Sequence, residues 1–367
     1  MSAKQSKPHR AARAVIHIGA PKAGSTSLQT ALSEGRARLS KTGVLYPRSL
    51  GDIAHNRLAA AVGPLLRRDS LRRDQRIRGP LSVRRLRKAL EAALAREMEE
   101  ARPETLLISS EHFYADATTV GEIVRLRSFA LRFADRVRIV VYLRRQDEAI
   151  YSAWLHGLRV GAAADFTPPT SIRTGDRHDY AARLALWRRV FPREDIIARP
   201  FEEATLQRGP ATDFLRLAGV RTTLKRRPAE NVALDRVRAE FMRRFNQLAP
   251  RCIEGEPNPL RGDIDLAIDE APSIAARPGL REEDAAAIMR LYERSNRKLA
   301  EEWGENGDFF SDRPPHLGDS LSALEIDDVV GIAAHLWAHK QKRLMKLKRK
   351  VKRMKAEQRR DAVAASA

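Results

Sequence analysis

Short apolar runs separated by helix-length segments constrain this chain more than any other feature of its 367 residues. Four runs have the length and composition of buried strands, at residues 14–18, 105–109, 137–143 and 195–198. A weaker run at 44–46, bounded by Gly43 and Pro47, fits an edge strand. Helical patterns lie between them, at 24–34, 83–101, 120–134, 145–156 and 180–190. This alternation predicts an α/β fold in which helices flank a parallel β-sheet.

After Arg199 the pattern is mostly helical, with helices expected at 210–218, 231–248, 282–303 and from 321 onward. The proline-containing segments 160–177 and 250–278 look irregular, and loops of this length commonly contact substrate. We expect a basic extension over residues 1–13, a main domain over 14–318 and a basic C-terminal helix or tail over 319–367.

Composition restricts the partners and the compartment. The formal net charge of +21 indicates anionic partners. No stretch approaches the roughly 18 apolar residues of a spanning helix. Cys252 is the only cysteine, which excludes an intramolecular disulfide and a cysteine-based zinc cluster, and we expect an inert thiol. The basic N-terminus lacks a secretory pattern, so the sequence predicts a cytoplasmic protein.

The clearest chemical signal is the segment Ile18–Gln29, in which a strand leads through a glycine-containing turn into a helix. Successive backbone N–H groups and the positive end of the helix converge in such a turn, which suits a phosphate. Gly19 and Gly24 match the outer glycines of G-x4-G-K-[ST], but Ser25 stands where that motif has lysine, and Lys22 comes earlier. No strand ends in a clear magnesium-binding acid, so a metal-dependent nucleotide hydrolase is disfavoured and no metal is expected.

This segment resembles the 5′-phosphosulfate loop of sulfotransferases that use 3′-phosphoadenosine 5′-phosphosulfate (PAPS), P-K-[ST]-G-[ST]-[ST] followed by a helix. Ala23 replaces the usual Ser or Thr, a mild departure because the family's contacts there are largely made by the backbone. The resemblance implies a P-loop-like fold and places Lys22 on the leaving phosphate. It also implies that the following residues bind the donor: Ala23, Gly24, Ser25, Thr26 and Ser27.

A second strand, turn and helix places Arg144 at the end of the run 137–143, the edge where open parallel sheets collect ligands. Ser152 follows about two helical turns later and can face the same anion. The family has the same Arg-x7-Ser spacing in its 3′-phosphate segment, so the resemblance assigns Arg144 and Ser152 to that phosphate. It covers about Val15 to Asn231.

Sulfuryl transfer needs a group that removes the acceptor's proton. Glu111 and His112 follow the strand 105–109 directly, and one of them should be the base. The family has one branch with a strand-end His and another, including carbohydrate sulfotransferases, with a strand-end Glu. Glu111 resembles the carboxylate branch, His112 is the second candidate, and His55 is a third that equally fits a surface histidine at a helix start.

Residues 340–360 contain twelve Lys and Arg against Glu357, a net +11, and Leu344, Leu347, Val351 and Met354 recur at 3,4,3 spacing. This pattern predicts a cationic amphipathic helix. It fits an anionic membrane surface, an acidic polymer such as nucleic acid, a short coiled coil or a solvated terminal helix.

The sequence thus favours a PAPS-dependent sulfotransferase acting on a hydroxyl, or an amine, of a carbohydrate or small metabolite. It would be cytoplasmic, or peripheral at the inner membrane surface, without specific nucleic-acid binding. The alternatives are a nucleotide-dependent kinase and a catalytically inactive nucleotide-binding or nucleic-acid-binding protein.

Overall fold

The computed structural model describes residues 9–66, 70–202, 206, 209–224, 234–254, 256–259, 261, 264, 267–268, 278–304, 307–311, 317–318, 321 and 324–365. The chain forms two compact units. The first comprises Met1–Ile150, Pro168–Asn231 and Glu283–Pro315, and the second comprises Tyr151–Thr167, Val232–Glu282 and His316–Ala367. The sequence boundaries at residues 13 and 318 stay predictions.

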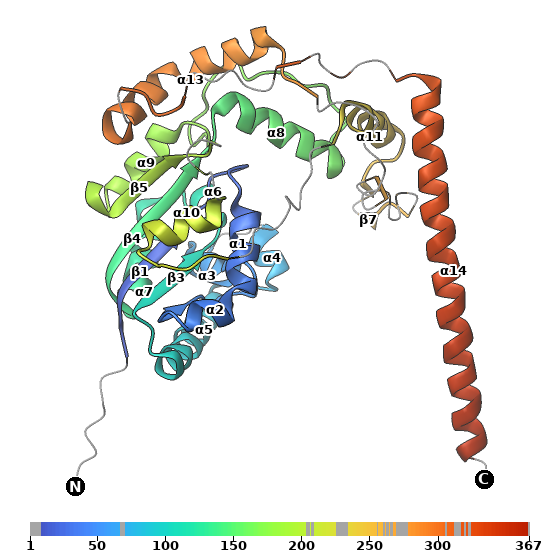
Figure 1. Ribbon diagram of the computed structural model, residues 1–367, viewed down its shortest axis with the longest axis horizontal. Helices are drawn as coiled ribbons and strands as arrows, with labels where there is room; N and C mark the ends of the chain where they lie inside the picture. Colours follow the sequence, from blue (N-terminus) through green and yellow to red (C-terminus); the bar gives the residue numbers. More distant parts are fainter. Residues whose placement is uncertain are drawn as a thin grey trace. The chain divides into compact units, whose positions relative to one another are not determined.

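A five-stranded parallel sheet forms the centre of the first unit, in the order β2-β3-β1-β4-β5 (Figure 1). Its strands are β1 (Ala11–His17), β2 (Val44–Leu45), β3 (Thr105–Ser109), β4 (Ala134–Leu143) and β5 (Ile196–Pro200). The α/β prediction is therefore confirmed, and β2 is an edge strand as expected. β4 begins before the predicted residue 137 because Ala134 pairs with Ala11.

Helices cover both faces of this sheet. The helices of the first unit are α1 (Ser25–Glu34), α2 (Arg36–Ser40), α3 (Asn56–Val62), α4 (Ser70–Asp74), α5 (Pro80–Ala101), α6 (His112–Ala115), α7 (Val120–Ala130), α9 (Tyr180–Arg188), α10 (Pro210–Leu217) and α13 (Glu282–Trp303), with a 3₁₀ turn at Arg193–Asp195. Helices α1 and α10 pack together in front of the sheet in Figure 1. Right-handed crossovers place the helices preceding β3, β4 and β5 on the other face, where α3 packs on α5 and α7.

The apolar strands form the core of this unit. All five residues of β3 and the last five of β4 are buried, which explains their continuous apolar runs. Side chains such as Ile16, Leu107 and Ile139 are fully buried between the two helical layers. The carboxyl ends of β3, β1 and β4 consequently lie side by side on a rigid base.

The second unit holds the end of α8 (Gln146–Arg159), α11 (Arg236–Leu248), the hairpin β6 (Cys252–Ile253) with β7 (Glu256–Pro257), and α14 (Ile326–Ala365). The hairpin lies within the segment expected to be irregular, and Cys252 is exposed. The C-terminal helix predicted from residue 321 begins at Ile326. No helix in the described residues is long and apolar enough to cross a membrane.

Candidate functional site

The turn between β1 and α1 contains three residues with left-handed backbone conformations. Gly19, Lys22 and Gly24 have φ values of 55°, 59° and 73°. Left-handed residues turn successive N–H groups toward one side of the chain and so form an anion-binding concavity. The loop geometry therefore suits a phosphate, as the sequence predicts.

Two glycines of this loop lie where a larger side chain does not fit. A Cβ at Gly19 would lie 2.8 Å from the Ser25 Oγ and 2.9 Å from the Glu111 Cα. A Cβ at Gly24 would lie 2.5 Å from a ring carbon of Phe201. Gly19 therefore brings the loop, the start of α1 and Glu111 into direct contact.

The first turn of α1 has donors directed to the loop. Gly24 is its N-cap and has no side chain to cap the helix. The Ser25 side chain is 5% exposed, and its Oγ has no hydrogen-bond partner among the described residues. A buried hydroxyl without a partner is costly unless a ligand or water satisfies it. Thr26 is exposed and Ser27 half-buried, whereas Ala23 is buried and packs in the core.

The two candidate bases after β3 have different surroundings. Glu111 is the exposed N-cap residue of α6, and its Cα adjoins Gly19. The His112 Nδ1 lies 2.6 Å from an Asp116 carboxylate oxygen, and the ring lines a small pocket with Ile123 and Trp187. The structure therefore places Glu111 against the phosphate loop and His112 in a pocket formed with α7 and α9.

His55 is the N-cap residue of α3, but it is fully buried, so its interpretation as a surface histidine is wrong. Its Nδ1 accepts a bond from the Ser109 N–H (3.0 Å), and its Nε2 donates to the Pro47 carbonyl (3.0 Å). Burial lowers the pKa of His55 to about 3. Both ring nitrogens are used within the fold, which leaves neither to accept a substrate proton.

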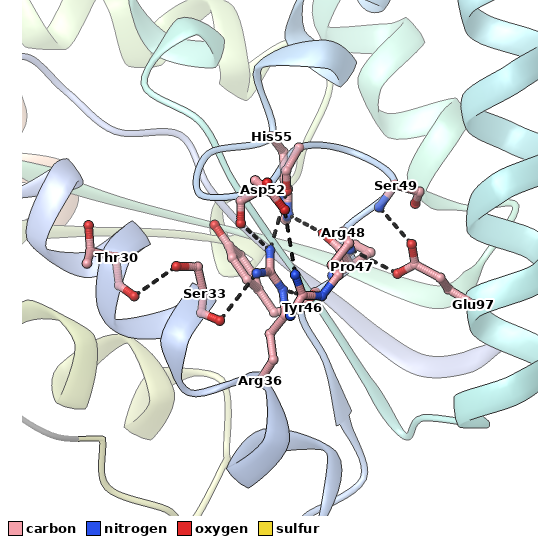
Figure 2. A network of polar contacts seen from close by, with 11 residues as sticks. Thr30, Ser33, Arg36, Tyr46, Pro47, Arg48, Ser49, Asp52, His55 and Glu97 are labelled. Atoms are coloured by element: carbon pink, nitrogen blue, oxygen red, sulfur yellow. Dashed lines mark hydrogen bonds and ion pairs between the residues drawn. The ribbon is translucent and has the colours of Figure 1, made fainter. Parts of the chain in front are cut away.

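The segment that holds His55 is fixed by Arg36 (Figure 2). The Arg36 guanidinium donates to the Tyr46 carbonyl (2.8 Å) and to the Asp52 carbonyl, and it lies over the Tyr46 ring. The Glu97 carboxylate accepts the N–H groups of Arg48 and Ser49. This network belongs to the scaffold that supports the end of β3.

One polar group beside the loop was missed by the sequence reasoning. His17 ends β1 and is fully buried, with its Nδ1 2.8 Å from the Ser109 Oγ, which also accepts from the Gln29 amide. The His17 Nε2 has no partner among the described residues. Burial lowers the pKa of His17 to about 3, so the ring is neutral. A histidine inside the otherwise apolar run 14–18 was the available signal.

Arg144 follows β4 directly, as predicted, and already has an anionic partner. Its Nε donates to the Glu148 carboxylate at 2.8 Å, and its carbonyl accepts the Tyr180 hydroxyl at 2.7 Å. The two Nη atoms of Arg144 have no partner among the described residues. Its guanidinium can therefore bind a phosphate while Glu148 orients it.

Ser152 lies on α8, in the part of that helix assigned to the second unit. Its pairing with Arg144 around one phosphate stays a prediction. No cluster of three or more His, Cys, Asp or Glu side chains able to hold a metal occurs within the described ranges.

No family model matches this chain. A curated protein from Archaeoglobus fulgidus, named "Uncharacterized protein", is 27% identical over 206 residues, which are 54% of this chain and 53% of that protein. The chain thus spans about half the length of this relative. The sulfotransferase domain from the Synechococcus PCC 7002 olefin synthase is a solved structure with 14% identity and a TM-score of 0.29, covering 79% of this chain and 97% of that domain. A structural similarity with so low a TM-score does not indicate a function. A function for this chain has to be inferred from the site itself.

Proposed function

We propose that this protein is a PAPS-dependent sulfotransferase. The observation that carries the proposal is the contact around Gly19, where a left-handed phosphate loop, the buried and unpartnered Ser25 hydroxyl and the Glu111 backbone meet. This arrangement combines donors for a phosphosulfate with the backbone of a residue that carries a carboxylate. The presence of Arg144 at the end of the adjacent strand β4 adds a cation for a second phosphate.

The proposed reaction is an in-line displacement at sulfur. The acceptor hydroxyl oxygen forms a bond to sulfur while the bond between sulfur and the 5′-phosphate oxygen breaks. Glu111 takes the acceptor's proton, and the electron pair of the broken bond stays on adenosine 3′,5′-bisphosphate. Lys22 and the amides of Gly24, Ser25, Thr26 and Ser27 stabilise the charge that develops on the leaving phosphate. The acceptor would be a carbohydrate or another small hydroxyl compound, or less readily an amine.

Alanine substitution of Lys22 and Arg144 tests the donor site. Each cation removed from a phosphate should weaken adenosine 3′,5′-bisphosphate binding by roughly tenfold to a hundredfold, and sulfate transfer from PAPS should be lost. Isothermal titration calorimetry measures the binding, and Lys41→Ala, at the exposed C-cap residue that follows α2, serves as a control. Unchanged binding in both variants would exclude the assignment, and ATP turnover without a response to PAPS would favour a kinase.

Substitution of Glu111 and His112, the two candidate bases after β3, tests which of them accepts the proton. Glu111→Gln should lower kcat by about 10²–10⁴ with little effect on bisphosphate binding, because the amide keeps the shape but accepts no proton. His112→Gln should change kcat by less than about tenfold, since His112 lies in the pocket with Asp116. The opposite ranking would assign the base to His112.

A further inference from the structure

The C-terminal helix α14 exposes an apolar seam along its length. Apolar side chains between 45% and 65% exposed occur along one side of it: Val330, Trp337, Leu344, Leu347, Val351 and Met354. With Ala333 and Lys340 they follow 3,4 spacing, which forms a seam that turns gradually around the helix, by about 20° per heptad. Single exposed apolar residues are ordinary, but a seam of exposed apolar residues, interrupted here only by Lys340, indicates a binding surface.

The buried part of this helix lies near its beginning. Ile332 is buried, and α14 contacts α11. Every side chain from Lys342 to Gln358 is exposed. Within the described parts of the second unit, the seam is therefore left open beyond its first turns.

The charges beside the seam identify the kind of partner. Twelve Lys and Arg against Glu357 occur in residues 340–360, and four of the cations flank the seam: Arg343, Lys348, Lys350 and Lys355. In a parallel pair of identical helices, Arg343 would face Lys348 and Lys350 would face Lys355, and an antiparallel pair would also oppose cations. Like charges at these positions disfavour a second copy of this chain and favour an anionic surface.

We propose that α14 binds the surface of an anionic lipid bilayer, with its axis in the membrane plane. The seam side chains would enter the boundary between headgroups and acyl chains, and the flanking Lys and Arg would extend to the lipid phosphates. Trp337 suits this boundary because its indole combines an apolar body with one polar N–H. A nucleic acid would bind the same cations but leave the seam in water. It would therefore explain the positive charge of α14 but not its exposed apolar side chains.

A matched pair of variants separates the seam from the charge. Val351→Glu and Met345→Glu change net charge equally at residues that are 50% and 53% exposed, but Met345 lies outside the seam. The full chain should bind phosphatidylcholine vesicles containing 30% phosphatidylserine in a sedimentation assay, and not vesicles of phosphatidylcholine alone. Val351→Glu should weaken this binding about tenfold more than Met345→Glu, because only Val351 is buried in lipid. Far-ultraviolet circular dichroism checks that both variants retain their helix content.

Several results would overturn the proposal. Equal weakening by the two variants would mean that charge alone binds the vesicles. Tighter binding to duplex DNA than to the anionic vesicles, insensitive to Val351→Glu, would assign the surface to nucleic acid. A dimer in analytical ultracentrifugation that Val351→Glu dissociates would assign it to a second copy.

Discussion

Replacing Gly19 by alanine perturbs the phosphate loop at a point where it packs closely against backbone. The new Cβ would lie 2.8 Å from the Ser25 Oγ and 2.9 Å from the Glu111 Cα, and the second of these is backbone that cannot rotate away. The φ of 55° adds about 1–2 kcal/mol of left-handed strain, and overpacking adds about 1–3 kcal/mol. The free energy of unfolding should therefore fall by about 2–5 kcal/mol.

Gly43→Ala provides the matched control. Gly43 has a similar φ of 69°, but a Cβ there would approach no atom closer than 3.7 Å. This variant should lose only the strain, about 1–2 kcal/mol, in urea unfolding. Titration with adenosine 3′,5′-bisphosphate should show unchanged affinity for Gly43→Ala and at least a tenfold loss for Gly19→Ala. Equal stability and equal affinity in the two variants would refute the packing argument.

Two other predictions follow from charged and buried groups. Glu148→Gln removes the carboxylate bonded to Arg144 and should tighten bisphosphate binding by up to about fivefold in calorimetry; unchanged affinity would separate Arg144 from the ligand. His17 and His55 have pKa values lowered to about 3, so the unfolded state binds more protons below pH 6.5. Stability should be constant above pH 7 and fall by about 2 kcal/mol per histidine between pH 7 and pH 5. Urea titrations check this, and a His17→Gln variant with an unchanged pH slope would contradict it.

The sheet could be predicted because its strands are buried on both faces. Residues 105–109 form β3 as expected, since a fully buried five-residue run with three apolar residues at its centre, lying between helices, has few other stable positions. Short helices such as α2 and α6 were not predicted because four or five residues carry too little periodicity. Their formation depends on tertiary contacts, such as the Arg36 bonds to the segment after β2.

The candidate site was predictable where a strand end fixes the position of a residue. Lys22, Glu111 and Arg144 follow β1, β3 and β4, and the parallel register brings these ends to one edge. Sequence could not distinguish the surroundings of Glu111 from those of its neighbour His112, because one residue on a helix turns the side chain by about 100°. The burial of His55 could likewise not be predicted from the sequence, because it depends on contacts with Pro47 and Ser109 in other segments.

The parallel pairing of β3, β1 and β4 also has a consequence for folding kinetics. His17 and Ser109, which meet at the base of the loop, are 92 residues apart in the chain. Pairings of such large sequence separation form slowly because loop-closure entropy opposes them. The phosphate loop cannot acquire its neighbour Glu111 until this central pairing has formed. Nucleotide binding during refolding would therefore report a late step, after helices formed by local contacts are already present.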